Sequence, residues 1–231
     1  MAIFEAKDLC KSYGSVPALS HVNFSVEPGK IVGLLGPNGS GKTTLIKMAN
    51  GLLTWEGGQL LIDGKAPGPE TKDIVSYLPE RTYLSDWMSA KQTLDFFQDF
   101  YPDFRRDRAE QMLQHLNIPL TQRIRQMSKG TREKVQLILV MSRAAKLYLL
   151  DEPIGGVDPA TRDYILNTII GNYDPEASVV ISTHLIADVE QILDEVIFIS
   201  QGQIVLQKSV DEIREEQGKS VDQLFREVFR C

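Results

Sequence analysis

A glycine-rich segment near the amino terminus constrains the fold more than any other feature. Residues 36–43 read GPNGSGKT, which matches the phosphate-binding pattern GxxxxGK[ST]. The segment follows IVGLLG, a short apolar run typical of a parallel strand buried on both faces, and precedes a predicted helix. A glycine-rich loop alone is more often a simple turn. The lysine and the preceding strand favour a phosphate-binding loop in an α/β domain instead.

The residues of this loop suit a bound triphosphate. Gly36, Gly39 and Gly41 let the backbone turn tightly, so that successive N–H groups point at phosphate oxygens without an intervening Cβ. Lys42 is expected to reach the β- and γ-phosphates, and Thr43 to bind Mg²⁺. The helix that begins here adds the positive end of its dipole. The predicted ATP-binding residues of the loop are Gly36, Pro37, Asn38, Gly39, Ser40, Gly41, Lys42, Thr43 and Thr44.

A second motif supplies the carboxylates that Mg²⁺ and ATP hydrolysis require. The segment LYLLDEP places Asp151 and Glu152 at the carboxyl end of an apolar strand, where α/β sheets bind their ligands. Asp151 is the predicted magnesium ligand. Adjacent strand residues point to opposite sides, so Glu152 can act on a water molecule that attacks the γ-phosphate. The alternative is that both residues merely end the strand before Pro153, and the complete phosphate loop favours the catalytic interpretation.

The composition argues against several classes of protein. Lys and Arg number 25 against 31 Asp and Glu, a net charge of −6, which argues against nucleic acid as a partner. Cys10 and Cys231 have no metal-type spacing, as expected in a reducing cytosol. No signal peptide is recognised, and no apolar run approaches the roughly 20 residues that cross a bilayer. Any membrane role is therefore expected to need a partner.

The pattern of apolar residues predicts one domain with an insertion. Residues 1–86 and 146–207 are expected to form an α/β core with a parallel sheet and, in the first third, an antiparallel β-subdomain. Residues 87–145 show apolar positions three and four apart, which predicts an inserted helical subdomain. Residues 208–231 are charged and predicted to be a helical tail. LIADVEQIL is expected to be a helix, and EVIFISQGQIVLQ a hairpin.

With GPNGSGKTT, MSKGT and LYLLDEP in this order, the chain resembles the ATP-binding subunit of ATP-binding cassette (ABC) transporters over essentially its whole length. MSKGT corresponds to the family's signature, usually LSGGQ. Ser128 and Gly130 match that signature, whereas Met127, Lys129 and Thr131 depart from it. Ser128 lies 23 residues before the aspartate of LYLLDEP, an interval that a helix and a strand can span. The resemblance implies a P-loop NTPase core and two such domains paired head to tail, with the signature of one closing over the γ-phosphate bound by the other.

The resemblance assigns roles to three further residues. Tyr13 would stack on adenine, although a tyrosine packed at a strand end is the alternative. His184, directly after the predicted strand SVVIST, would contact the γ-phosphate. Asp158 matches the aspartate of the family's D-loop, and Asp158-Pro159 also reads as an ordinary helix start. Together with Lys42 and Glu152, His184 completes the expected catalytic set.

Glu80 is the main departure from the family pattern. At the end of SYLPE the family normally has glutamine, which touches the metal and the attacking water. Glutamate can still bind Mg²⁺ but adds negative charge near the γ-phosphate, and the predicted metal ligands are Thr43, Glu80 and Asp151. The next stretch, RTYLSDWM, lies where the family's membrane subunit docks. Core packing of the helical subdomain explains its apolar residues equally well.

The sequence therefore favours an Mg²⁺-dependent ATPase that powers transport through separate membrane subunits. The resemblance implies ATP and Mg²⁺ as cofactors, and as partners a transmembrane permease subunit and a second ATP-binding subunit, identical or not. It also implies a cytoplasmic, peripheral position on the membrane, and LPERTYL and MSKGT favour export. One alternative is a soluble ABC ATPase acting on ribosomes or DNA, which usually has two cassettes or a long coiled coil. The other is a regulatory nucleotide-binding module without turnover, against which Glu152 and His184 argue.

Overall fold

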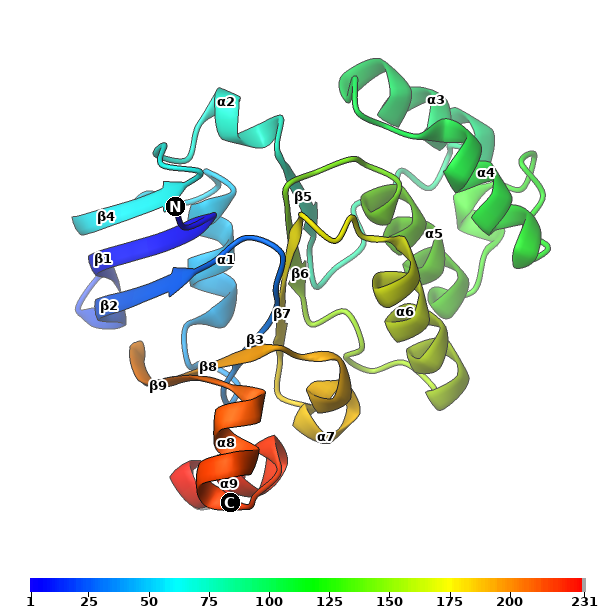
Figure 1. Ribbon diagram of the computed structural model, residues 1–231. Helices are drawn as coiled ribbons and strands as arrows, with labels where there is room; N and C mark the ends of the chain where they lie inside the picture. The colour runs from blue at the N-terminus through cyan, green and yellow to red at the C-terminus, as the bar shows by residue number, and fades with distance from the viewer. Residues whose placement is uncertain (230–231) are drawn as a thin grey trace.

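The computed structural model describes residues 1–229, in which two β-sheets enclose a helix and further helices lie to one side (Figure 1). The larger sheet has six strands in the order β5-β6-β7-β3-β8-β9, and only its edge strand β9 runs antiparallel to its neighbour. Strands β3, β6 and β7 are buried along their full length, as expected for central strands covered on both faces. The strands of this sheet are β3 (Ile31–Leu35), β5 (Val75–Leu78), β6 (Leu147–Asp151), β7 (Ser178–Thr183), β8 (Glu195–Ser200) and β9 (Gln203–Ser209).

The second sheet is antiparallel and covers one face of the domain. Its three strands, in the order β2-β1-β4, are β1 (Phe4–Tyr13), β2 (Val16–Val26) and β4 (Gly57–Ile62). Helix α1 (Lys42–Ala49) lies between the two sheets, where Leu45 and Ile46 share one apolar core with side chains of both (Figure 1). This packing holds the start of α1, and the phosphate loop in front of it, against the larger sheet. The fold class predicted from the sequence is confirmed.

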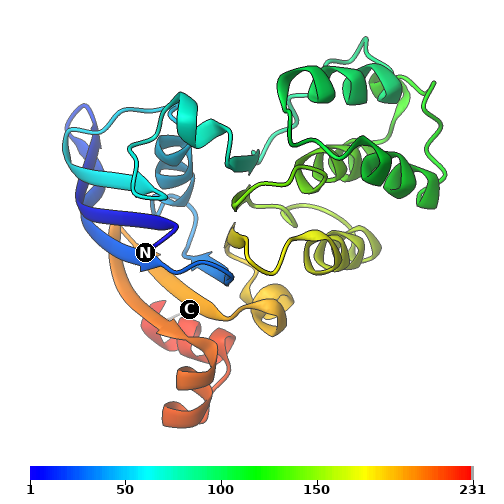
Figure 2. The same ribbon diagram turned by 45° about the horizontal axis from the view of Figure 1, so that its top comes forward.

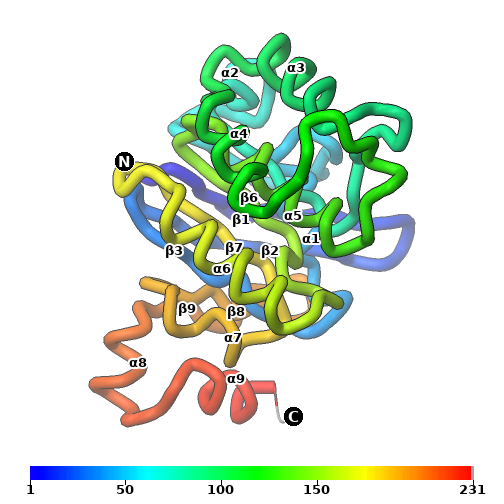
Figure 3. Tube along the Cα trace, turned by 90° about the vertical axis from the view of Figure 1, so that its right-hand side faces the viewer, coloured from blue at the N-terminus to red at the C-terminus, as the bar shows by residue number. Residues whose placement is uncertain are grey.

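Helices cover the opposite face of the larger sheet. Their apolar residues pack with those of β6, β7 and β8 in a second core. Phe225 of the last helix meets Phe198 of β8 edge to face, with ring centroids 5.4 Å apart. Figure 3 shows α8 and α9 beyond β8 and β9, at the end of the domain. The helices of this face are α5 (Lys129–Met141), α6 (Pro159–Asn172), α7 (Ile186–Val189), α8 (Val210–Gln217) and α9 (Val221–Phe229).

The predicted helical insertion contains α3 (Ala90–Phe100), α4 (Arg106–His115), a 3₁₀ turn (Ile124–Gln126) and α5. These elements surround a small core of their own, which includes Leu94, Leu113 and Ile138. Figure 2 shows α3 and α4 set apart from the sheets on one side of the molecule. Helix α5 contributes both to this core and to the core beneath the larger sheet, so it joins the two parts.

One buried cation ties the helical insertion to the sheet. The guanidinium group of Arg143 pairs with Asp103 at 3.0 Å and lies 4.0 Å from the centroid of the Tyr101 ring. It also donates to the carbonyl oxygens of Val75 at 2.6 Å and Asp73 at 2.8 Å, at the start of β5. A buried charge is tolerated when it is paired and hydrogen-bonded in this way. Arg143 therefore holds the end of α5 and the start of β5 in a fixed relation.

The structure departs from the predicted elements in two places. LIADVEQIL is helical as predicted, but as the short α7 followed by a 3₁₀ turn, Glu190–Ile192, in place of one α-helix. Just after this segment, the Asp194 carboxylate accepts a hydrogen bond from the N–H of Ile31 at 2.7 Å, where the chain enters β8. A short helix α2 (Pro69–Lys72), not predicted, begins with proline at its first position.

The charged tail forms α8 and α9, and residues 230–231 of the predicted tail, including Cys231, lie outside the described residues. Within residues 1–229, no helix combines the length and the apolar character needed to cross a bilayer.

Candidate functional site

The phosphate loop runs from the carboxyl end of β3 to the start of α1. Gly41 has a φ of +111°, a left-handed backbone conformation that favours glycine. Gly36 is needed for a different reason, because a Cβ there would lie 2.3 Å from the carbonyl oxygen of Ile199 on β8. The loop thus turns tightly at its end and lies against the neighbouring strand at its beginning, leaving room for phosphate on the open side.

The ammonium group of Lys42 is buried in this loop. Its Nζ donates to the carbonyl oxygens of Gly36 at 2.8 Å and Pro37 at 3.2 Å, and lies 3.5 Å from Oε1 of Glu152. Burial lowers the pKa of Lys42, and the Glu152 carboxylate opposes that shift. An incoming phosphate group therefore competes for this cation with two backbone carbonyls and one carboxylate.

Asp151 lies at the end of β6, and its two carboxylate oxygens differ in their hydrogen bonds. Its Oδ1 accepts hydrogen bonds from the hydroxyl of Ser182 at 2.6 Å and that of Thr43 at 3.1 Å. Its Oδ2 is buried and has no partner among the described residues. Burial raises the pKa of Asp151, and the hydrogen bonds from Ser182 and Thr43 oppose that shift.

This arrangement fits a magnesium ion. An orphaned carboxylate oxygen beside the Thr43 hydroxyl offers the oxygen ligands that Mg²⁺ prefers. Within residues 1–229 no group of three His, Cys, Asp or Glu side chains could hold a metal by itself. That agrees with the way Mg²⁺ binds in nucleotide sites, where one or two protein ligands are supplemented by phosphate oxygens and water.

Glu152 follows Asp151 in an uncommon backbone conformation. Its φ is +49°, in the left-handed region, and its N–H donates to the Ser182 carbonyl at 3.0 Å. Strand alternation alone, as invoked from the sequence, therefore does not set its direction. Both carboxylate oxygens of Glu152 lie 3.1 Å from Nδ1 of His184, which follows β7. Non-glycine residues with such backbone angles cluster at functional sites, where the surrounding contacts hold them.

Asn38, Glu80, Glu152 and His184, all predicted site residues, line one cleft. It has a volume of about 730 Å³ and lies at the carboxyl ends of the parallel strands, where α/β sheets bind ligands. Its lining residues are Asn38, Glu80, Arg81, Thr82, Lys129, Glu152, Gly155, Gly156 and His184. Tyr13, Ser128, Gly130 and Asp158 are not among the described residues that line it.

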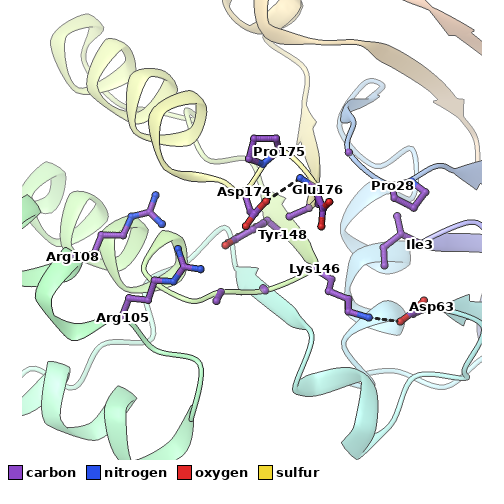
Figure 4. Close-up of a pocket in the computed structure, with 14 residues that line it drawn as sticks. Ile3, Pro28, Asp63, Arg105, Arg108, Lys146, Tyr148, Asp174, Pro175 and Glu176 are labelled. Carbon is purple, nitrogen blue, oxygen red and sulfur yellow. Dashed lines mark hydrogen bonds and ion pairs between the residues drawn. The ribbon is translucent and has the colours of Figure 1, made fainter.

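A second cleft, of about 630 Å³, lies at the opposite ends of the strands (Figure 4). Lys146 there pairs with Asp63 at 2.9 Å, and Arg108 donates to the side-chain oxygen of Asn172 at 3.0 Å. Asp174 and Glu176 also line it, so its positive and negative side chains balance. None of the predicted site residues lies there among the described residues, and the amino ends of parallel strands are not where such folds bind nucleotides.

Two polar residues at the site were not singled out from the sequence. Ser182 donates to Asp151, and its position in the apolar run SVVIST was the available signal. Gln136 of α5 is buried, accepts a hydrogen bond from the N–H of Tyr83 at 3.2 Å and donates to the carbonyl of Pro79 at 3.3 Å. These two bonds flank Glu80, so Gln136 holds the Glu80 loop against α5.

Glu80 lies just after β5, exposed at the rim of the main cleft. We predict that Glu80→Gln increases ATP turnover about two- to fivefold or lowers the Mg²⁺ concentration needed for half-maximal rate, because a negative charge near the γ-phosphate is removed. A magnesium titration of steady-state hydrolysis measures both quantities. Glu80→Asp keeps the charge and should show no such gain. Superimposable curves for the parent and Glu80→Gln would contradict the prediction.

The signature residues stand at the start of α5. Oγ of Ser128 accepts a hydrogen bond from the N–H of Thr131 at 3.2 Å, which makes Ser128 the N-cap of the helix. A Cβ at Gly130 would be in ordinary contact, 3.6 Å from Oγ1 of Thr161, so the fold of the single chain does not demand glycine there. The Lys129 side chain is 77% exposed and lies 3.7 Å from Glu133.

Two further residues singled out from the sequence lie at the ends of elements. Asp158 caps α6, accepting hydrogen bonds from the N–H of Thr161 at 3.0 Å and from its hydroxyl at 2.7 Å. The ordinary helix start anticipated for Asp158-Pro159 is therefore present. Tyr13 ends β1 with half of its surface exposed, and the Lys11 ammonium group lies 5.5 Å from its ring centroid. The ring is available for stacking.

The stretch after Glu80 was given two interpretations, packing in the helical insertion and docking of a membrane subunit, and its residues differ in which one they fit. Leu84 packs against the core of the helical insertion. Tyr83 is 48% exposed and lines a groove between α1 and α3, and Trp87 is also exposed. Packing therefore accounts for Leu84 and in part for Tyr83, whose ring stacks on Phe97 with centroids 6.5 Å apart, whereas Trp87 is exposed.

Comparison with known proteins identifies the family. A family model described as ABC transporter matches residues 19–155. The chain is 31% identical to the SkfA peptide export ATP-binding protein SkfE of Bacillus subtilis, over 94% of this chain and 93% of that protein. It is 30% identical to the lipopolysaccharide export system ATP-binding protein LptB of Haemophilus influenzae, over 96% and 97%. A solved structure of an ATP-binding subunit of an ABC transporter has a TM-score of 0.89 at 29% identity, covering 98% of this chain and 99% of that one.

The matched segment begins in β2 and includes the phosphate loop, the signature and the two carboxylates at the end of β6, Asp151 and Glu152. The agreement of this match with the fold and with the cleft supports a transporter role over the soluble and regulatory alternatives. The chain therefore belongs to the ABC transporter family, as an ATP-binding subunit with ATPase activity.

Proposed function

We propose that this chain hydrolyses ATP as one half of a head-to-tail dimer that drives a separate membrane permease. The observation that carries the proposal is the meeting of Lys42, Glu152 and His184 beside Asp151, whose buried Oδ2 has no hydrogen-bond partner within residues 1–229. A site built only to bind nucleotide has no need of a carboxylate held in a left-handed backbone conformation next to a histidine.

Substrate binding would use the phosphate loop. Lys42 would exchange its bonds to the Gly36 and Pro37 carbonyls for bonds to the β- and γ-phosphate oxygens. Thr43 and Asp151, with Glu80 at the rim, would hold Mg²⁺, which neutralises charge on the phosphate oxygens. The exposed ring of Tyr13 supports stacking on adenine.

The chemical step would use Glu152 as the general base. As the oxygen of a water molecule attacks the γ-phosphorus, the bond between that phosphorus and the bridging oxygen of ADP breaks, and Glu152 accepts the water proton. The products are ADP and inorganic phosphate. His184 contacts both oxygens of Glu152 and so positions the carboxylate for this transfer.

The second copy would complete the site. Ser128 and Gly130 do not line the chain's own cleft, and Gly130 is not required by the chain's own packing, which supports a role outside the monomer. The N–H of Thr131 is capped by Ser128, but within residues 1–229 those of Lys129 and Gly130 have no acceptor and could bind an anion, and Gly130 allows close approach of a partner's γ-phosphate. Asp158, whose loop contains Gly155 and Gly156, would lie at the same interface.

The relatives support a direction of transport. The names of SkfE and LptB refer to export systems for a peptide and for lipopolysaccharide, and we infer export for this chain. A cytoplasmic position at the membrane, held by the permease, follows from the need for ATP. The net charge of −6 gives no reason to expect nucleic acid as a partner.

Mixing two inactive variants tests whether each site is shared between copies. Lys42→Ala removes the phosphate-loop cation, and Ser128→Asp places a negative charge at the signature while preserving a good N-cap residue. Each variant alone should lack ATPase activity. An equimolar mixture should regain about a quarter of the parent rate, since half of the dimers are mixed and each of these contains one complete site.

Ser128→Asn is the matched control, because it keeps the N-cap without the added charge and should retain substantial activity. A mixture as inactive as its components would contradict sharing of the site between two copies. Full activity of Ser128→Asp alone would contradict the role assigned to the signature.

A further inference from the structure

Two arginines at the start of α4 line the cleft of Figure 4, and no carboxylate in the described part of the chain pairs with them. The first, Arg105, is exposed, and its side chain forms no ion pair or hydrogen bond within residues 1–229. Its backbone N–H donates to the carbonyl of Ser142 at 2.8 Å, which fixes the position of the residue. The guanidinium group can therefore bind a ligand without giving up an existing contact.

The second arginine, Arg108, lies three residues further on, on the same face of the helix. It is half-buried, its Nε donates to Oδ1 of Asn172 at 3.0 Å, and its Nη2 donates to the backbone carbonyl of the same residue. Both acceptors are neutral. Burial lowers the pKa of Arg108, and the nearby charge of Arg105 lowers it further. Two neighbouring guanidinium groups without a counterion favour the binding of an anionic group.

The facing wall of the cleft is negative. Asp174 lies in the loop before β7, and Figure 4 shows both guanidinium groups reaching toward it from α4. Its Oδ1 accepts a hydrogen bond from the N–H of Glu176 at 3.0 Å, but within residues 1–229 no cation pairs with either carboxylate. Lys146, which also lines the cleft, is already paired with Asp63. The cleft thus keeps unpaired positive and negative charge apart on two walls.

This separation of charge selects the class of ligand. A simple anion would be attracted to Arg105 and Arg108 but repelled by Asp174, and a simple cation would meet the opposite problem. A zwitterion satisfies both walls when its carboxylate faces the arginines and its ammonium group faces Asp174. The volume of about 630 Å³ lies in the range of pockets that hold small molecules.

We propose that this cleft binds a small zwitterion, of which a short peptide is the simplest example, and that the bound molecule slows ATP turnover. Helix α4 shares a core with α5, which begins at the signature, whereas Asp174 belongs to the sheet core that carries the catalytic carboxylates. A ligand held by both walls would join these two parts and restrict the movement of one against the other. The regulatory part rests on the proposed function, which supplies the turnover, but the binding part does not.

Three related peptides test the two charged ends separately. The probes are Ala-Ala-Ala, its N-acetylated form, which lacks the ammonium group, and its C-terminal amide, which lacks the carboxylate. Titration calorimetry with the full chain and no nucleotide should show Ala-Ala-Ala binding about tenfold more tightly than either capped form at low salt. Both differences should shrink at high salt. Equal affinities of the three peptides, or no binding of Ala-Ala-Ala, would overturn the proposal.

One variant of each wall identifies the site. In Arg105→Gln the advantage of a free carboxylate should fall to about threefold or less, while the advantage of a free ammonium group remains. Asp174→Asn keeps an oxygen for the N–H of Glu176 and should show the converse. Because each variant keeps one preference, a fold defect is distinguished from the loss of one charge. Arg214→Gln changes an exposed arginine of α8 outside the cleft and should keep both preferences. Both preferences unchanged in both wall variants would place the peptide elsewhere and overturn the proposal.

The regulatory part has its own measurement. Saturating Ala-Ala-Ala should lower steady-state ATP turnover of the parent about twofold or more, because movement of the helical insertion is restrained. At the concentration that half-saturates the parent, the effect should be smaller in Arg105→Gln, each rate being compared with that of the same variant without peptide. Binding without a change in turnover would overturn the regulatory part. Because binding is measured without ATP, failure of the shared-site experiment would contradict the proposed function and leave the binding result unaffected.

Discussion

Glu152→Gln should lower kcat about a hundredfold or more while ATP stays bound, which is the range expected when a general base is removed. The amide cannot accept the proton of the attacking water. It also lacks the negative charge that lies 3.5 Å from the Lys42 ammonium group, so no carboxylate at this position competes with ATP for that cation. Nucleotide affinity should therefore be retained or increased, and the ATP-bound dimer should accumulate.

Single-turnover hydrolysis and sedimentation with Mg²⁺ and ATP measure the two effects separately. The parent should dimerise only transiently, whereas Glu152→Gln should sediment as a stable dimer. Glu176→Gln removes an exposed carboxylate at the opposite ends of the strands and should behave as the parent. If Glu152→Gln hydrolyses ATP at the parent rate, Glu152 is not the base.

Lys42→Ala should weaken ATP binding about a hundredfold, because a buried cation that meets two phosphate groups is lost. In the structure this ammonium group is buried and already surrounded by acceptors, two backbone carbonyls and one carboxylate. Arg81 and Lys129 also line the cleft, but within residues 1–229 no lysine or arginine other than Lys42 donates a hydrogen bond to the phosphate loop, so the loss of Lys42 leaves the loop without its bound cation. Hydrolysis should then fall because the site stays empty.

Titration calorimetry with Mg²⁺ and ATP provides the measurement, and circular dichroism checks the fold. Lys47 lies on the same helix, where its side chain lines the groove between α1 and α3, and Lys47→Ala should bind ATP as the parent does. ATP affinity of Lys42→Ala within about threefold of the parent, a free-energy difference of less than about 0.7 kcal/mol, would contradict the role assigned to Lys42.

The local motifs of the site could be read from the sequence because each depends on neighbouring residues. The loop glycines, Lys42 and Thr43 belong to one segment, and the apolar run before Asp151 identified its strand. The same reasoning identified LIADVEQIL as helical, but apolar spacing did not indicate that its second half tightens into a 3₁₀ turn, Glu190–Ile192.

Contacts between distant segments could not be predicted in this way. Ser182 reaches Asp151 because β6 and β7 pair in parallel with Asp151 opposite Ser182. Gln136 reaches the Glu80 loop because α5 packs beside β5, and no spacing in the sequence indicates this. The left-handed conformation of Glu152 also depends on its bonds to the neighbouring strand.

The sequence by itself determined the α/β class, the phosphate loop, the two carboxylates and the resemblance to ABC ATP-binding subunits, because these depend on local pattern and residue order. Tertiary structure alone decided which side chains meet: Ser182 and Thr43 at Asp151, whose Oδ2 has no partner within residues 1–229, and Glu152 at His184. The physical reason is that burial and charge pairing arise only when segments far apart in the chain pack together. Packing therefore decides whether a buried charged or polar group has a compensating partner, and this sets the pKa and reactivity of the group.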